Sequence, residues 1–163
     1  TRKKRGGSQD YYIFTSENDF KNKVSNDFFL EHALVHGNFY GTSKDFVETK
    51  IAEGINIILE IDVQGVQQIK STNFPHESIF LLPPSIDSLT ERLSERGTNS
   101  KESIELRLSN AMKEIPSCKD YDHILVNDVF EDCCGDLVRI ITGEDSFPMN
   151  PKKELFLTKL LNS

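Results

Sequence analysis

The polar side chains between residues 31 and 65 carry most of the chemistry that this chain can offer. The segment 31–42 reads Glu-His-Ala-Leu-Val-His-Gly-Asn-Phe-Tyr-Gly-Thr, and the segment 57–65 reads Ile-Ile-Leu-Glu-Ile-Asp-Val-Gln-Gly. Glu60 and Asp62 interrupt an otherwise apolar run, while Glu31, Tyr40 and Thr42 lie close to glycines. Buried polar groups are costly unless they bind something. The pattern therefore predicts a site for a small polar ligand with hydrogen-bond donors.

Glu31 and Thr42 flank the turn-like segment 37–41. A carboxylate can accept from two adjacent N–H donors, which is what the Watson–Crick edge of guanine offers, and a threonine hydroxyl can complete such a contact. A helix-cap or surface role for each residue is the alternative, and these two residues alone do not decide between the two interpretations.

Arg2 and Arg5 lie three residues apart beside glycines at the start of the chain. Two guanidinium groups at this spacing could converge on one phosphate through bidentate hydrogen bonds, with Tyr12 and Tyr40 as hydroxyl donors. The alternatives are a solvated basic terminus, and a localisation signal or RNA-binding arm.

A second group of arginines comprises Arg92, Arg96 and Arg107. The first two are four residues apart, so on a helix they share a face. The segment 97–100, Gly-Thr-Asn-Ser, then predicts a flexible bend before the helix with Arg107. A mobile lid with arginines could close over phosphates and neutralise charge that develops during their transfer. The alternative is surface ion pairing with the neighbouring acids Glu91, Glu95, Glu102 and Glu105.

The elements that would position these residues alternate between helix and strand. Ser16 and Ser43 are candidate N-caps of two short helices, and Gly54 is a candidate C′ residue for the second. Residues 55–63 are predicted as a buried strand with Glu60 and Asp62 near its carboxyl end. Ligands of parallel sheets collect beyond the carboxyl ends of the strands, which makes these two acids site candidates.

The second half of the chain repeats this alternation. Strands are predicted at 78–82 and 123–126, with a helix capped by Ser85, a helix from about residue 100, and a helix at 131–142. The last helix is expected to turn Leu137, Val138 and Ile141 inward. Alternating strands and helices imply right-handed crossovers and a mainly parallel sheet in an α/β domain.

Composition narrows the class of protein. The 163 residues suit one domain, and the net charge of −7 argues against a general nucleic-acid binder. The longest run of large apolar residues, 79–82, is far too short for a membrane span. Cys118, Cys133 and Cys134 lack metal-ligand spacing and are expected to be free thiols in a reducing cytoplasm.

Together the motifs resemble the guanylate kinase family of P-loop nucleoside monophosphate kinases. The resemblance runs from Thr1 to about Thr142. It rests on Thr1-Arg2-x-x-Arg5, Tyr12-x-Phe14, Glu31-x-Ala33, His36-Gly-Asn-Phe-Tyr-Gly-Thr42, Leu59-Glu-Ile-Asp-Val-Gln-Gly65, Pro83-Pro-Ser85, Arg92-Leu-x-x-Arg96-Gly-Thr98, Arg107-Leu108 and Val126-Asn-Asp128.

The resemblance implies a single domain over 1–163 with a three-layer parallel sheet. It implies a GMP-binding subdomain at about 6–54, a helical lid at about 85–115 and a C-terminal tail at 143–163. The implied activity is transfer of the γ-phosphoryl group of ATP to GMP, giving ADP and GDP in purine nucleotide metabolism. Mg²⁺ would accompany ATP, and the protein would be cytoplasmic. The family pattern is compatible with a homo-oligomer and includes no nucleic-acid or membrane partner.

The resemblance also assigns roles by position. The clamp for the GMP phosphate would be formed by Arg2, Arg5, Tyr12 and Tyr40. The guanine readers would be Glu31 and Thr42, with Asp62 close to the nucleotide. Glu60 would support Mg²⁺ indirectly. The lid and catalytic arginines that hold the ATP phosphates would be Arg92, Arg96 and Arg107, with Asn127 on the adenine side.

One family motif is absent from this sequence. None of the nine glycines is followed by Lys, so the chain contains no Gly-x-x-x-x-Gly-Lys-[Ser/Thr] loop. The family carries that loop in an N-terminal βα unit, and we therefore expect the first βα unit to be missing through truncation. The alternative hypothesis is a non-catalytic guanylate-kinase-like module that binds other proteins.

Overall fold

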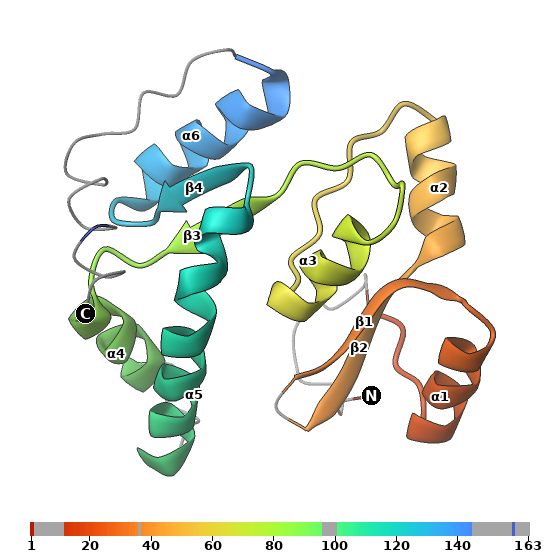
Figure 1. Cartoon of the computed structure of the whole chain (residues 1–163), viewed down its shortest axis with the longest axis horizontal. Helices are drawn as coiled ribbons and strands as arrows, with labels where there is room; N and C mark the ends of the chain where they lie inside the picture. Colours follow the sequence, from red (N-terminus) through yellow and green to blue (C-terminus); the bar gives the residue numbers. More distant parts are fainter. Residues whose placement is uncertain (2–11, 36, 96–100, 145–157, 159–163) are drawn as a thin grey trace. The chain divides into compact units, whose positions relative to one another are not determined.

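The computed structural model describes residues 1, 12–35, 37–95, 101–144 and 158. The chain divides into two compact units, Thr1–His76 and Glu77–Ser163. The elements of both units are drawn in Figure 1.

The first unit is built on a β-hairpin. Strands β1 (Phe29–Val35) and β2 (Asn38–Ser43) pair antiparallel, with an irregularity in register between Phe29 and Glu31. The connecting turn includes Gly37, whose φ of 77° lies in the left-handed region that favours glycine. The residue types at 31–42 indicated a turn-like segment and did not predict this hairpin.

Three helices surround the hairpin: α1 (Glu17–Ser25), α2 (Lys44–Ala52) and α3 (Val63–Lys70). The predicted caps are confirmed, because Ser16 Oγ accepts from Asp19 N and Ser43 Oγ accepts from Phe46 N. Gly54 follows α2 with a φ of 76°, which is the conformation expected of a C′ glycine.

The core of this unit has an aromatic part and an aliphatic part. Phe20 of α1 stacks on Phe29 and Phe39 of the two strands, with ring centroids 4.6 and 5.3 Å apart. Stacked rings at this spacing pack α1 against the hairpin. The aliphatic part contains buried Leu30, Val47 and Ile69 and the half-buried side chains of Ile57, Leu59, Ile61 and Phe74.

The prediction of a strand at 55–63 is wrong for the structure as described. Residues 55–62 form no strand, and α3 begins at Val63. The segment still alternates like a strand, since residues 57, 59 and 61 pack into the core while Ile55 and Ile58 are exposed. A strand needs a hydrogen-bonded neighbour as well as an apolar pattern, and the two sheets found among the described residues do not include this segment.

The second unit contains a parallel pair of strands, β3 (Ile79–Leu82) and β4 (His123–Val126), as the alternating pattern predicted. Side chains on both faces of this pair are buried. One face packs Leu82 and Val126 against Ile115 and Cys118, and the other packs Leu125 against Cys133 and Ile140. Burial on both faces explains most of the apolar character of the two strands, although Leu81 of β3 is exposed.

The crossover between β3 and β4 consists of α4 (Ile86–Glu95), α5 (Lys101–Glu114) and the 3₁₀ helix η1 (Ile115–Asp120). Ser85 caps α4 as predicted, because its Oγ accepts from Ser88 N at 3.0 Å. At the start of the two strands, Asp122 Oδ2 accepts from Ser78 N and Ser78 Oγ at 2.8 and 2.6 Å. These bonds tie the two strand starts together.

Helix α6 (Phe130–Thr142) covers the second face of the pair. The expectation that Val138 and Ile141 face inward is wrong, because both are exposed, whereas Cys133 and Ile140 are buried and Leu137 packs beside them. Positions 133, 137 and 140 form one stripe of the helix. Val138 and Ile141 lie one position beyond that stripe.

Cys118, Cys133 and Cys134 keep their thiols outside any disulfide, as predicted. No helix within the described part of the chain combines the length and the apolar character that crossing a membrane requires.

Candidate functional site

The strongest site feature in the first unit is a buried carboxylate bound to a hydroxyl on the neighbouring strand. Glu31 of β1 is the register partner of Thr42 of β2. Thr42 Oγ1 donates to Glu31 Oε1 at 2.6 Å, and Glu31 is only 4% exposed. The two residues that were paired from the sequence across a turn are therefore in direct contact.

The environment of Glu31 makes its charge costly. Burial raises the pKa of its carboxyl above the ordinary value of 4.5, and the nearby negative charge of Asp62 raises it further. The hydrogen bond from Thr42 and the neighbouring His32 oppose that rise in pKa. A carboxylate kept in such a place is well suited to accept hydrogen bonds from a ligand, which would offset the cost of its desolvation.

Tyr40 lies on the same face of the hairpin as this pair. It is the register partner of Ala33 and lies two residues before Thr42 on β2, so their side chains point to the same side. Thr1 is bound next to it, because the Thr1 backbone nitrogen donates to Phe39 O at 2.6 Å and Phe39 N donates to Thr1 Oγ1 at 2.9 Å. The basic N-terminal motif therefore begins beside Tyr40.

Asp62 has a defined structural role that its position in the sequence did not reveal. It is the N-cap of α3, and its Oδ1 accepts from Gly65 N at 3.0 Å. Its Oδ2 accepts from Gln64 Nε2 at 3.0 Å. Asp62 is also close enough to Glu31 to raise the pKa of that carboxyl. The cap thus places a second carboxylate near the Glu31–Thr42 pair.

A further contact that the sequence did not predict fixes α3 on the hairpin, where the two elements lie side by side in Figure 1. The side-chain amide of Gln68 bonds both backbone groups of His32: His32 N donates to Oε1 at 3.1 Å, and Nε2 donates to His32 O at 2.7 Å. One glutamine thereby replaces the partner that a neighbouring strand would offer to β1. The residue type alone gives no signal for such a bond.

The other residues predicted to contact a phosphate in this unit are Arg2, Arg5 and Tyr12. Arg2 and Arg5 lie outside the described residues. Tyr12 is 49% exposed, and its ring centroid is 6.3 Å from that of Phe14. The convergence predicted for these side chains stays a prediction.

In the second unit the structure brings Arg92 and Asn127 together. Arg92 of α4 donates through Nη2 to Asn127 O at 2.9 Å, directly after the carboxyl end of β4. Asn127 N in turn donates to Leu82 O at 2.8 Å. The guanidinium is thus fixed at the end of the parallel strands, which is where α/β sheets bind their ligands.

Arg107 of α5 differs from Arg92. Its Nε is buried and has no hydrogen-bond partner, alone in this respect among the buried side-chain nitrogens and oxygens of the described residues. Neither Arg92 nor Arg107 forms an ion pair with any described residue. The alternative of surface ion pairing is therefore not supported for these two arginines. Arg96 lies outside the described residues.

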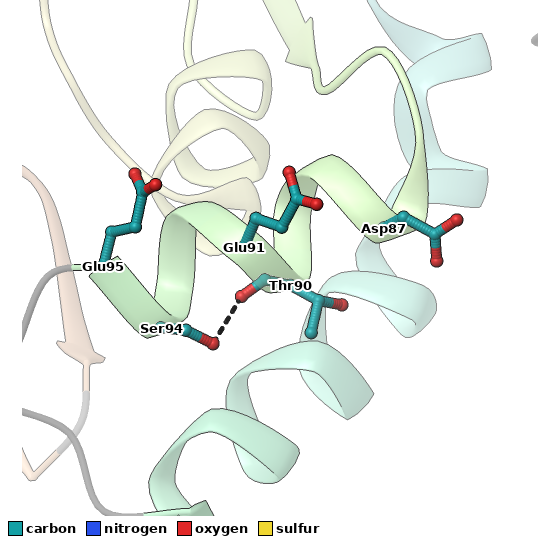
Figure 2. A pocket seen from close by; sticks show the side chains of 5 residues that line it. All are labelled: Asp87, Thr90, Glu91, Ser94 and Glu95. Carbon is teal, nitrogen blue, oxygen red and sulfur yellow. Dashed lines mark hydrogen bonds between the residues drawn. The ribbon is translucent and has the colours of Figure 1, made fainter.

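A shallow groove on α4 is lined by Asp87, Thr90, Glu91, Ser94 and Glu95 (Figure 2). Its residues all belong to one helix, and Ser94 Oγ donates to Thr90 O at 2.8 Å within that helix. Three carboxylates would repel a phosphate. We therefore do not assign a ligand to this groove.

Glu60, predicted to support a magnesium ion indirectly, has an exposed side chain in the segment before α3. The described residues contain no group of three or more His, Cys, Asp or Glu that could hold a metal. Mg²⁺ is usually held by one or two carboxylates together with substrate phosphates. The role of Glu60 toward Mg²⁺ therefore stays a prediction.

The comparisons with known proteins agree on one family. Residues 1–144 match the family model described as guanylate kinase. The guanylate kinase of Hydrogenovibrio crunogenus is 45% identical over 139 residues, which cover 84% of this chain and 68% of the relative. The guanylate kinase of Escherichia coli strain K12 is 44% identical over 147 residues, covering 88% and 70%. A crystal structure of guanylate kinase from Anaplasma phagocytophilum superposes with a TM-score of 0.73 at 31% identity, covering 99% of this chain and 79% of that one.

Proposed function

The chain belongs to the guanylate kinase family, and from this premise we propose that it acts in the transfer of the γ-phosphoryl group from ATP to GMP. The proposal includes a GMP-binding subdomain at about 6–54 and a lid at about 85–115. The observation that carries it is the buried Glu31–Thr42 pair.

In this proposal the Glu31 carboxylate accepts hydrogen bonds from the N1–H and the 2-amino group of guanine. Thr42 supports it in two ways: its hydroxyl holds Oε1 at 2.6 Å, and its hydrogen bond lowers the pKa of Glu31 against the effect of burial. Both effects favour the ionised carboxylate, which accepts hydrogen bonds without donating any. Adenine presents a different pattern of donors and acceptors on this edge, so Glu31 would select guanine.

The phosphate of GMP is assigned to the clamp of Arg2, Arg5, Tyr12 and Tyr40. Its support is the position of Tyr40 on the same face as Thr42, together with the bonds that hold Thr1 beside Phe39. One guanidinium group can donate two parallel hydrogen bonds to a phosphate. Because the group is planar and rigid, it loses little conformational entropy for each bond. The clamp would orient a phosphate oxygen of GMP toward the phosphate that it attacks.

The ATP side is assigned to Arg92, Arg96, Arg107 and Asn127. Arg92 is held at the carboxyl end of β4 by its bond to Asn127 O, and Arg107 keeps a buried Nε without a partner. A buried donor without a partner costs free energy, and a phosphate oxygen placed beside it would accept its hydrogen bond and remove that cost. Mg²⁺, supported indirectly by Glu60, would neutralise charge on the phosphates of ATP.

Isothermal titration calorimetry tests the guanine-binding part of this proposal. The 163-residue chain is expected to bind GMP and to discriminate against AMP. Glu31→Ala should weaken GMP binding by roughly tenfold or more, as loss of hydrogen bonds to a charged group predicts.

Glu48→Ala is the matched control, since Glu48 is an exposed glutamate on α2. It should leave GMP binding unchanged. Equal affinity of the wild type and Glu31→Ala for GMP would reject the proposed role of Glu31 and would favour a non-catalytic binding module.

A further inference from the structure

Gly65 lies in the first turn of α3, on the side of the helix that faces the Glu31 carboxylate. A Cβ added to Gly65 would lie 2.7 Å from Glu31 Oε2 and 3.2 Å from Ile61 Cβ. The glycines of the described residues with positive φ are at 37, 54 and 143, so the backbone at residue 65 does not require glycine. What residue 65 lacks is space for a side chain, and the group that occupies this space is the Glu31 carboxylate.

Helix α3 cannot easily move away to make room for a side chain. Gln68 lies one turn after Gly65, and its amide bonds both backbone groups of His32, the residue that follows Glu31. Asp62 fixes the start of the helix through its bond to Gly65 N. A methyl group at residue 65 would therefore displace the carboxylate at the end of its flexible side chain before it displaced the helix.

The two carboxylate oxygens of Glu31 have different surroundings. Oε1 accepts from Thr42 Oγ1, whereas Oε2 lies against Gly65. A push on Oε2 would turn the carboxylate away from the plane in which it can accept two parallel hydrogen bonds. The bond to Thr42 would be strained in the same movement.

We propose that Gly65 is a positioning residue for guanine recognition. Because it has no side chain, Glu31 Oε2 stays where it can accept a hydrogen bond from the 2-amino group of GMP. This inference rests on the proposed role of Glu31 in reading guanine. IMP is the discriminating ligand, because hypoxanthine keeps the N1–H of guanine and lacks the 2-amino group. A displaced carboxylate should lose its preference for GMP over IMP.

The test is calorimetry of GMP and IMP binding to the 163-residue chain and to two variants. Gly65→Ala is expected to lower the ratio of GMP to IMP affinity by roughly tenfold, the loss of one hydrogen bond to a charged group. Gly135→Ala is the matched control, because Gly135 is also within a helix but a Cβ there would meet nothing within 4 Å. It should leave both affinities unchanged.

Thermal unfolding separates positioning from packing. Alanine is a better helix former than glycine, so Gly135→Ala should not melt below the wild type. Gly65→Ala should remain folded, because the group that has to move is the end of a flexible side chain. An unchanged GMP-to-IMP ratio in Gly65→Ala would overturn the inference alone. Loss of folding in Gly65→Ala with Gly135→Ala intact would also overturn it, since residue 65 would then serve packing. A wild type without preference for GMP over IMP would refute the proposed guanine contact and this inference with it.

Discussion

At the level of single residues, Glu31 combines burial, a hydroxyl partner and a neighbouring negative charge. The pKa of its carboxyl is raised mainly by burial, with Asp62 as a further cause, while Thr42 and His32 lower it. Such a balance is common where a group awaits a ligand that will stabilise its charged form. The sequence could identify Glu31 and Thr42 as candidates, but their contact depends on a strand register that residue types do not reveal.

The raised pKa gives the stability of the fold a defined pH dependence. Between 4.5 and the raised value the folded state binds more protons at Glu31 than the unfolded state does. The contribution of Glu31 to the free energy of unfolding therefore falls as pH rises through this window and stays constant above it. Glu31→Gln keeps an acceptor for Thr42 and cannot ionise. We expect its stability relative to the wild type to rise across the same window.

Urea unfolding of both proteins from pH 4 to pH 8 measures this difference. Parallel pH profiles for the wild type and Glu31→Gln would show that burial of the carboxylate does not cost stability.

At the level of elements, the sequence predicted local features better than pairing. Ser16, Ser43 and Ser85 cap helices as expected, because a cap depends on residues within one turn. The parallel pair at Ile79–Leu82 and His123–Val126 was also predicted correctly. Both faces of the pair carry buried side chains, so the strands read as apolar runs even though Leu81 is exposed.

Features that depend on distant neighbours could not be predicted in the same way. Residues 55–62 have the alternation of a strand, but no partner strand lies beside them in the described structure. The predicted inward face of α6 differs from the buried one by one position. Val138 and Ile141 are as apolar as the buried residues, so residue type alone does not separate them. The hydrogen bonds from the Gln68 amide to His32 of β1 also join residues that are far apart in the sequence, so they could not be predicted either.

That amide gives a prediction for the stability of the first unit. Gln68→Ala leaves the N–H and C=O of His32 without their side-chain partner in a partly buried place. We expect it to reduce the free energy of unfolding by about 1–3 kcal/mol, the usual cost of an unsatisfied buried group. The measurement is urea denaturation followed by circular dichroism.

Gln67→Ala is the control, because Gln67 is the neighbouring exposed glutamine on the same helix. Its effect should be within about 0.5 kcal/mol. Equal losses in the two variants would contradict this prediction, because alanine is the better helix former at both positions and only Gln68 bonds His32.

At the level of the whole molecule, the chain spans 68–79% of the length of the three relatives named for the family. It contains no P-loop motif to hold the phosphates of ATP. We therefore expect the 163 residues to bind GMP with negligible phosphoryl transfer. A chimera with a βα unit that contains the Gly-x-x-x-x-Gly-Lys-[Ser/Thr] loop placed before Thr1 should release ADP in a GMP-dependent manner in a coupled assay.

The same chimera tests the division of labour among the arginines. Arg5→Ala should mainly raise the KM for GMP, because its expected partner is the phosphate of the bound substrate. Arg107→Ala should mainly lower kcat, by roughly 100-fold, because it is expected to meet charge that develops during transfer. Similar changes of both parameters in both variants would contradict this division.

The most direct measurement is a titration of the ¹⁵N-labelled 163-residue chain with GMP, followed by backbone amide shifts. We predict saturable shifts at Glu31, Tyr40, Thr42 and the start of α3 near Asp62, because these residues would line one nucleotide site. Shifts that are confined to the acidic face of α4, or no shifts at millimolar GMP, would contradict it.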